Sequence, residues 1–567
     1  MRPAQRTGVL AVAALALAVL AAASGAADAG TGRDVRRPKK LIAVGWDLFF
    51  DTHWLLAHHA EMDQRPFDGI TINVVGRDDD GKPVEMRLAF RKGAWKEAWF
   101  DAARADLVAC KFRNLRDNFL MVWANPGDVD WFDDDGWRDI VEHWRLAARL
   151  AKRSGCRGLC FDPEPYYGPH AAFTYAAQTG RQDHSFAAYA AKVRERGREV
   201  MKAVAAEFPE ATILAFFLNS ICGRATGHAD PAPLLEADGY GLLPAFVDGW
   251  LDAAPPTVTM VDGHEHAYRY NSDVEFLEGA NLIRNTCQEF VSPENRAKYR
   301  AQVQVGYGVY LDAHINPPTS PWYIDPLGGP RVERLRANVA AACRAADEYV
   351  WVYGEKCRWW PTPNKRVTER TWPEALPGCE DALRFARDPV AGARWKVEEL
   401  RKASALQDLM AGGDFLVGPK EAGGRPDGWG AWQDSASKGA FAWDADVGAA
   451  AKGSARLAGV ANGCLIAKIE VKPGQRYAVE AVRRLKGAGD AVLVVRWQTA
   501  DDTWTAEARD VSVPCTGPRD AWAEMFGVAE VPEGAGKLVV LLLARGQKSA
   551  DDLAWFDDVR VYRLDGR

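Results

Sequence analysis

The sequence has few of the features that mark several large protein classes. Its ten cysteines in 567 residues are too few for a fold held together mainly by disulfides. A net charge of -6 gives no reason to expect nucleic acid as a partner. No serine nucleophile elbow, phosphate-binding loop or dinucleotide fingerprint occurs, and no membrane span is predicted. With 48% hydrophobic and 26% charged residues, the composition is that of a globular protein.

The N-terminal segment has the three parts of an export signal. Arg2 and Arg6 form a basic start, residues 8–23 are small or apolar, and Ala27-Asp28-Ala29 fits a small-x-small cleavage site. We therefore predict a signal peptide over residues 1–29 and a mature protein that is secreted or periplasmic.

Tryptophan is the residue type in excess, with 22 in the chain. Indole is large and hard to bury completely, so such an excess indicates flat apolar platforms in clefts or on surfaces. Sugar rings are suitable ligands for these platforms, because their C–H faces stack on indole. The alternative interpretation is a core that is rich in tryptophan.

Strand-like apolar runs alternate with helical stretches before residue 364. Eight strand–helix units in about 320 residues predict an α/β fold, a (β/α)8 or TIM barrel, over residues 38–363. A doubly wound parallel sheet is the main alternative. The predicted strands cover residues 41–47, 69–75, 119–125, 158–164, 212–219, 257–262, 303–310 and 349–355.

Polar side chains close most of these strands, and they favour the barrel. Enzymes with this fold assemble their active sites from the carboxyl ends of the strands, which surround one axis. An open sheet would not bring all of these residues together. They are Asp47, Asn125, Asp162, Glu164, Asn219, Asp262 and Glu355.

Beyond residue 363 the pattern changes twice. Residues 364–406 predict a helical connector, and residues 407–567 predict an all-β sandwich of short alternating runs. Four motifs in order resemble those of jelly-roll carbohydrate-binding modules, which are often attached to xylanases and glucanases. They are Gly413-Asp414-Phe415, Asp427-Gly428-Trp429, Pro473-Gly474-Gln475-Arg476-Tyr477 and Phe556-Asp557-Asp558-Val559.

This resemblance implies a jelly-roll fold and leaves sugar binding open. Some modules of this kind bind sugar, and others only pack on their enzyme. A calcium ion commonly joins the first strand to the last in this family, and Asp414 and Asp557 are the matching positions for a structural calcium. Leu416 replaces a glutamate that is often found in the first strand.

The segment from Gly158 to Tyr166 is the most informative for chemistry. Asp162 and Glu164 are two residues apart on a predicted strand, so both side chains project from the same face. Each is followed by proline, which holds the residue before it in extended geometry. Leu159 and Phe161 on the other face suit packing against helices. A rigid carboxylate pair at the end of a buried strand is unfavourable for stability and useful for catalysis.

The Asp-x-Glu motif formed by Asp162 and Glu164 resembles a signature of two groups of glycoside hydrolase barrels. These are the chitinase-like and the family 25 lysozyme-like barrels, in which the glutamate donates a proton. The fuller Asp-x-x-Asp-x-Asp-x-Glu motif of chitinases is absent, because Cys160 occupies an upstream aspartate position. The resemblance therefore implies the role of Glu164 and not membership of either group.

Cleavage of a glycosidic bond requires an acid for the leaving oxygen and a second group that stabilises the oxocarbenium-like centre. We predict Glu164 as the general acid, with a pKa raised by Asp162, and Glu355 as the second carboxylate. The alternatives are a purely structural Asp162 and a Glu355 that pairs with Lys356 or with an arginine of the barrel. The next candidates for the second carboxylate are Asp262, Glu265 and Asp312.

The complete prediction is a secreted glycoside hydrolase that acts on a poly- or oligosaccharide and requires no cofactor. One rival is a non-catalytic glycan-binding protein with a degenerate barrel. The other is a metal-dependent hydrolase, because His264 and His266 form a His-x-His pair that can chelate zinc. The predicted substrate-binding residues are Trp46, Asp47, Asn125, Tyr166, Asn219, Asp262, Glu265, Tyr310, Trp359 and Trp360.

Overall fold

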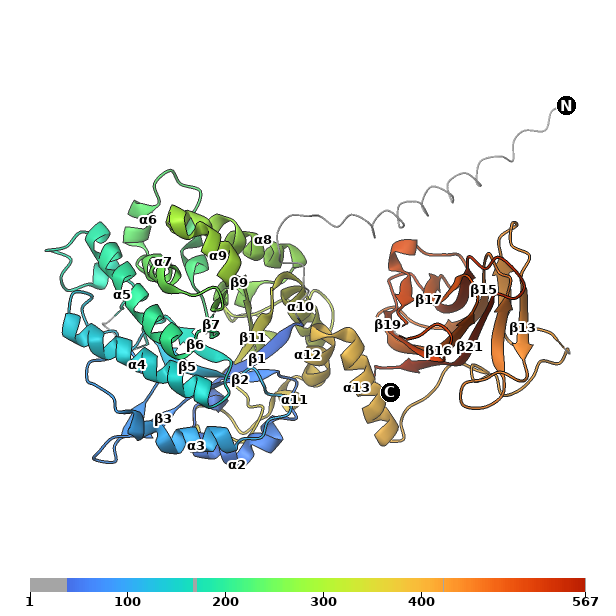
Figure 1. Cartoon of the computed structure of the whole chain (residues 1–567), viewed down its shortest axis with the longest axis horizontal. Coiled ribbons are helices and arrows are strands. Elements are labelled where there is room, and N and C mark those ends of the chain that lie inside the picture. The colour runs from blue at the N-terminus through green and yellow to red at the C-terminus, as the bar shows by residue number, and fades with distance from the viewer. Residues whose placement is uncertain (1–37, 167–170, 422, 516, 566–567) are drawn as a thin grey trace. The chain divides into compact units, whose positions relative to one another are not determined.

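The computed structural model describes residues 38–166, 171–421, 423–515 and 517–565 (Figure 1). The predicted signal peptide over residues 1–29 lies outside the described residues. Within the ranges that are described, no helix is long and apolar enough to cross a membrane.

The first part of the chain forms a nearly closed parallel barrel. Its strands follow the order β10-β11-β1-β2-β5-β6-β7-β8-β9 in one sheet, and β1 pairs with β11 in parallel. Only Gly306 separates β9 from β10, so the two ends of the sheet meet in a single stretch of chain. All eight predicted strands are present, the seventh split in two. They are β1 (Lys40–Gly45), β2 (Gly69–Ile72), β5 (Phe119–Trp123), β6 (Gly158–Asp162), β7 (Thr212–Ala215), β8 (Thr259–Asp262), β9 (Val303–Val305), β10 (Tyr307–Tyr310) and β11 (Tyr349–Gly354).

Helices cover the outer face of this sheet (Figure 1). Four of these helices, α2, α4, α5 and α8, start at a side-chain cap; Asp133, for example, accepts a hydrogen bond from the Gly136 backbone at the start of α4. A small hairpin of β3 (Val75–Arg77) and β4 (Pro83–Glu85) follows β2. The helices are α2 (Thr52–Met62), α3 (Asp101–Ala109), α4 (Asp134–Arg153), α5 (Phe186–Glu207), α6 (Ala232–Ala237), α7 (Leu243–Ala253), α8 (Asp273–Arg284), α9 (Arg296–Gln302) and α10 (Arg331–Ala345).

The predicted connector is helical, and the segment after it is all β. The connector contains α11 (Trp372–Ala375), α12 (Cys379–Arg387) and α13 (Pro389–Lys402). Two five-stranded antiparallel sheets follow, in the orders β12-β15-β20-β17-β18 and β13-β14-β21-β16-β19. Their strands are β12 (Gly430–Gln433), β13 (Ala440–Asp444), β14 (Ser454–Ala458), β15 (Asn462–Glu470), β16 (Arg476–Lys486), β17 (Asp490–Gln498), β18 (Val511–Val513), β19 (Ala523–Glu530), β20 (Lys537–Arg545) and β21 (Leu553–Arg563).

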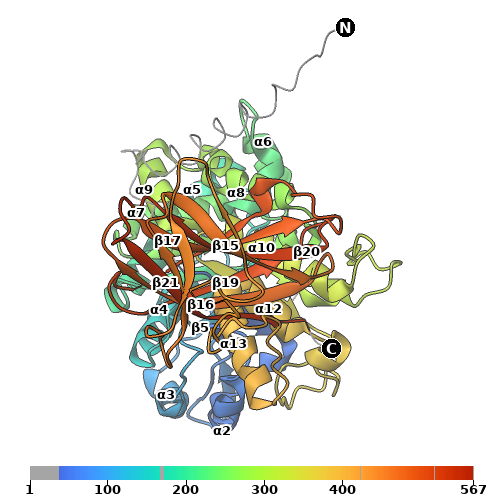
Figure 2. The same ribbon diagram turned by 90° about the vertical axis from the view of Figure 1, so that its right-hand side faces the viewer.

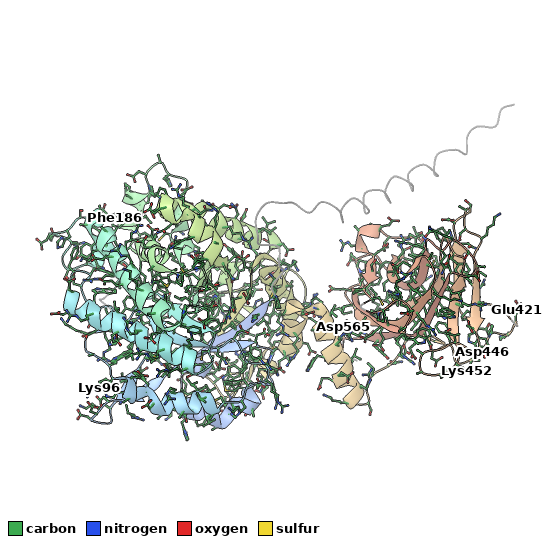
Figure 3. The ribbon with its side chains drawn as sticks, viewed as in Figure 1. Lys96, Phe186, Glu421, Asp446, Lys452 and Asp565 are labelled. Atoms are coloured by element: carbon green, nitrogen blue, oxygen red, sulfur yellow. The ribbon has the colours of Figure 1, made fainter. Side chains whose placement is uncertain are left out.

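The two C-terminal sheets share one apolar core. Leu493 and Leu542 of the first sheet belong to the same buried cluster as Val479 and Phe556 of the second. Figure 2 looks onto the strands of these sheets, and Figure 3 shows the side chains between them. The ion pair of Lys452 with Asp446 lies at the edge of this part (Figure 3). A two-sheet sandwich is therefore present, and its jelly-roll connectivity stays a prediction.

The tryptophans serve both of the expected purposes. Trp46, Trp123 and Trp322 line a cavity of the barrel, as the platform interpretation expects. Many others fill the interior, as the core interpretation expects. The fully buried tryptophans are Trp131, Trp137, Trp144, Trp250, Trp351, Trp360, Trp372 and Trp497.

Candidate active site

A cavity of about 340 Å³, which we call the inner cavity, lies at the carboxyl ends of the barrel strands. Four acidic side chains line it. Asp162 and Glu164 come from the end of β6, Glu265 begins the short helix after β8, and Glu355 follows β11. Parallel strands of a barrel end around one axis, so residues distant in sequence converge there.

Asp162 and Glu164 reach the inner cavity because side chains alternate along β6. Phe161 points to the other face, where its ring centroid lies 5.3 Å from that of Trp144 and 5.5 Å from that of Trp250. Asp162 is buried, and its Oδ1 accepts a hydrogen bond of 2.9 Å from the Glu164 backbone N–H. Burial, reinforced by the charge of Glu164, raises the pKa of Asp162 to about 8.

Glu265 is placed by a tight turn after β8. A Cβ on Gly263 would lie 2.2 Å from the carbonyl oxygen of Ala215 and 2.7 Å from Nε1 of Trp351, so only glycine fits there. His264 then adopts a left-handed conformation with a φ of 42°, and Glu265 follows at the start of the short helix. The turn is followed directly by Glu265, which lines the inner cavity.

The environment of Glu265 favours its protonated form. Burial is the largest cause, and the charges of Glu164, Asp162 and Glu355 act in the same direction. Together they hold the pKa of Glu265 well above its usual range. Glu265 is therefore the acid of the inner cavity whose environment favours retention of a proton, and it lies in the same lining as Glu164 and Glu355.

Glu355 is held by two phenols. The hydroxyl of Tyr353 donates to its Oε1 at 2.7 Å, and the hydroxyl of Tyr310 donates to its Oε2 at 3.0 Å. The ammonium of Lys356 donates to Asn316 instead, so the Glu355–Lys356 pair considered from the sequence does not form. Glu355 is oriented as an acceptor that faces the inner cavity.

Four aromatic side chains, which we call the aromatic collar, line both the inner cavity and a neighbouring outer cavity of about 500 Å³. They are Trp46, Phe49, Trp123 and Tyr166. Ring centroids lie 5.0 Å apart for Trp46 and Phe49, and 4.8 Å apart for Trp123 and Tyr166. The Tyr166 hydroxyl also donates to Oδ2 of Asp162 at 2.7 Å. The collar therefore connects apolar ring faces directly to the acidic groups.

Six predicted binding residues are buried and do not line either cavity: Asp47, Asn125, Asn219, Asp262, Trp359 and Trp360. Several of them hold strand ends in place. Asp262 accepts hydrogen bonds from the backbone N–H and the hydroxyl of Ser220 at 2.9 and 2.6 Å. Asn125 donates its amide to the carbonyl oxygen of Glu164. Asn125 therefore holds the backbone of Glu164, and Asp262 links the end of β8 to the short helix after β7.

Asn219 is buried at the start of the short helix after β7, whereas Asp47, Trp359 and Trp360 belong to the packing around β1. Asp47 Oδ2 accepts a 2.8 Å hydrogen bond from the Trp359 backbone N–H. The rings of Trp359 and Trp360 meet Phe67 edge-on, with centroids 5.1 and 6.1 Å away. Their indoles are therefore not free to stack on a sugar. Asp312 has a similar role after β10, because it accepts the Glu355 backbone N–H at 2.8 Å.

Sequence reasoning missed much of the aromatic lining. Trp123 and Tyr353 precede Asn125 and Glu355 by two positions, so strand alternation could have identified them. The remaining rings come from segments outside the strands and offer no periodic signal. They are Phe49, Phe216, Tyr268 and Trp322.

The described residues contain no group of three or more His, Cys, Asp or Glu side chains that could hold a metal ion. Nε2 of His264 bonds with the Tyr270 hydroxyl at 2.6 Å, which does not fit a zinc ligand. In the sandwich, both oxygens of Asp557 accept backbone N–H groups. Calcium takes six to eight oxygen ligands, so Asp414 and Asp557 alone do not make a calcium site. The calcium of the family resemblance stays a prediction.

A pH dependence of stability follows from Asp47, whose pKa burial raises from 3.8 to about 7. The folded state holds this proton more tightly than the unfolded chain, so the stabilisation is complete below about pH 4 and is lost as the pH rises to about 7. Asp47→Asn does not titrate and keeps an acceptor for Trp359. We expect its free energy of unfolding, relative to the wild type, to rise by about 1.4 kcal/mol per pH unit across this window.

Urea denaturation at several pH values measures this difference. Asp51→Asn is the matched control, because Asp51 is exposed and caps α2, where asparagine serves equally well. The control should leave the pH dependence as in the wild type. A relative stability of Asp47→Asn that stays flat with pH would refute the buried, protonated state of Asp47.

No protein-family model and no curated protein matches the chain. Solved structures with a partial likeness include the enzymatically active domain of tailspike protein 4 of bacteriophage CBA120, with 12% identity, 28% of this chain and 21% of that chain covered, and a TM-score of 0.22. The CBM22-1 xylan-binding domain of Paenibacillus barcinonensis Xyn10C has 13% identity, with 29% of this chain and 97% of that chain covered, and a TM-score of 0.22. The CBM22-1–GH10 modules of Clostridium thermocellum xylanase 10B have 16% identity, with 28% of this chain and 29% of that chain covered, and a TM-score of 0.21.

The chain spans less than a third of the length of the tailspike domain and of the xylanase modules. With TM-scores this low, these likenesses assign neither a fold nor a function to the chain. The proposed activity is therefore inferred from the geometry of the inner cavity.

Proposed function

We propose that the protein is a glycoside hydrolase whose inner cavity cleaves a glycosidic bond by carboxyl acid–base catalysis. The supporting observation is the convergence of Asp162, Glu164, Glu265 and Glu355 on one cavity with aromatic walls. Gathering four partly buried acids is unfavourable for folding, and acid–base cleavage between sugars requires such a pair of carboxyl groups. The aromatic collar offers ring faces on which sugars stack.

In this proposal Glu265 donates the proton to the leaving oxygen. A general acid must be protonated at the working pH, and the raised pKa of Glu265 meets that requirement. Among the neighbouring charges, that of Glu164 has the largest effect on the pKa of Glu265, so in this proposal Glu164 serves as the nucleophile or as the base that activates water. The donor role thus moves from Glu164, where the sequence put it, to Glu265.

The other two acids support this pair. Asp162 fixes the backbone of Glu164 through its N–H, and its own proton limits the negative charge of the inner cavity at neutral pH. Glu355 is held by Tyr310 and Tyr353 on the remaining side and is positioned to stabilise a developing positive charge on the sugar ring.

The family resemblance of the C-terminal segment and the pattern of the N-terminal segment supply the rest of the proposal. The sandwich over residues 407–567 is a jelly-roll module that binds carbohydrate or packs on the barrel, with a structural calcium at Asp414 and Asp557. The signal peptide over residues 1–29 directs the protein out of the cytoplasm, to a compartment where polysaccharides are the substrates.

The test is a screen of the full-length protein against polysaccharides, oligosaccharides and aryl glycosides, with products identified by mass spectrometry. At least one glycan should be cleaved by the wild type and not by the double variant Glu164→Gln/Glu265→Gln. A folded protein that binds a glycan and cleaves none would favour the non-catalytic alternative. Activity lost to a chelator and restored by zinc would favour the metal-dependent one.

A further inference from the structure

The outer cavity differs sharply in charge from the inner cavity beneath it. Besides the aromatic collar, it is lined by Arg87 and by the loop residues Pro363, Asn364, Lys365 and Arg366. Three of these side chains are cationic, and no acid lines it among the described residues. The inner cavity, in contrast, is lined by four acids and by no lysine or arginine of the described chain.

The loop that carries Lys365 and Arg366 is pinned to the collar. The Asn364 side-chain amide donates to the carbonyl oxygen of Trp46 at 2.7 Å, and Val367 is buried behind the loop. The Arg366 guanidinium lies 4.8 Å from the ring centroid of Trp46. Both cations are exposed at the rim of the outer cavity, and the contact with Trp46 positions the Arg366 side chain there.

The two cations of this loop are not neutralised by acidic side chains of the described residues. In the described part of the chain, neither Lys365 nor Arg366 forms an ion pair, whereas nearby Arg358 pairs with Glu369 at 2.7 Å. On the opposite wall, Arg87 lies 4.1 Å from the ring centroid of Trp123 and is bound to Glu85. Exposed lysines are often unpaired, but here two unpaired cations share one cavity with stacking surfaces.

We propose that the outer cavity is a binding subsite for a sugar that carries an anionic substituent, either a uronate carboxylate or a sulfate ester. The guanidinium of Arg366 can bind two oxygens of such a group in one plane, and Lys365 adds a point charge. The sugar ring itself packs against the aromatic collar. The inner cavity repels a second anion, so the cleaved linkage lies at a neutral or protonated part of the chain. This inference rests on the proposed function, whose site it deepens.

The experiment measures affinities by titration calorimetry with Glu265→Gln protein, so that bound glycans are not consumed. The probes are polygalacturonate and alginate for carboxylates, carrageenan for sulfates, and methyl-esterified galacturonan and agarose as neutral counterparts. At least one acidic glycan should bind about tenfold or more tightly than its neutral counterpart, and this advantage should shrink as salt rises from 50 to 300 mM because charge pairs are screened. Preference for a carboxylate or a sulfate probe identifies the substituent.

Lys365→Gln/Arg366→Gln should abolish the advantage of the acidic glycan and leave binding of neutral glycans unchanged. Lys111→Gln removes an exposed cation after α3 and is the matched control, and Arg366→Lys should keep part of the advantage. The inference is overturned if no acidic glycan binds, or if the double variant binds it as tightly as Glu265→Gln alone. Charge-dependent binding without cleavage by the wild type would refute the proposed function and leave the subsite standing.

Discussion

Replacing Glu265 by glutamine is expected to lower kcat/KM for a natural glycoside by about 10²–10⁴-fold, the usual contribution of a general acid. The same variant should act on a 2,4-dinitrophenyl glycoside within about tenfold of the wild type, because that leaving group departs without a proton. Glu164→Gln should lose activity on both substrates, since the second carboxylate is required whatever the leaving group. Initial rates on the two substrates measure these effects.

The pH profile provides a second measurement of the same assignment. Glu265 must be protonated to act, so kcat/KM of the wild type should fall on the alkaline side as this proton is lost. In Glu265→Gln, assayed on the dinitrophenyl glycoside, this alkaline decrease should disappear. If Glu164→Gln instead retains activity on the dinitrophenyl glycoside and Glu265→Gln loses it, the two roles are reversed and Glu164 is the proton donor.

Replacing Trp351 by alanine is expected to destabilise the barrel by about 3–5 kcal/mol, the range for deleting a large buried aromatic side chain. Trp351 projects from β11 into the barrel, where its ring stacks on Phe216 with centroids 4.3 Å apart. Its Nε1 donates to the carbonyl oxygen of Gly263 at 2.8 Å. This indole therefore supports both Phe216, part of the floor of the inner cavity, and the turn before Glu265.

Trp351→Phe is the matched variant, because it keeps an aromatic ring while it loses the N–H donor and part of the buried ring volume. It should destabilise the barrel less than alanine does, with about 0.5–1.5 kcal/mol of the loss due to the missing hydrogen bond. Urea denaturation followed by far-UV circular dichroism measures both variants. An alanine variant with the midpoint of the wild type would show that Trp351 does not support the barrel.

The elements of the barrel were predictable where their signals are local. Along β6, alternation placed Phe161 against helices and Asp162 toward the interior, as the structure shows. Prediction was less successful at Trp359 and Trp360. They follow a strand end, as binding residues often do, but their indoles pack on Phe67, which approaches from a different part of the chain.

Taken alone, the sequence determined the order of the strands and the acids that end them, because side-chain alternation and the effect of proline act over two or three residues. The sequence could not indicate which of these acids retains a proton and can serve as the general acid. Only the tertiary structure decided that Glu265 shares a buried cavity with Glu164, and that cations line the rim above them. Burial and the distance between charges set a pKa, and both depend on segments that meet only when the barrel closes.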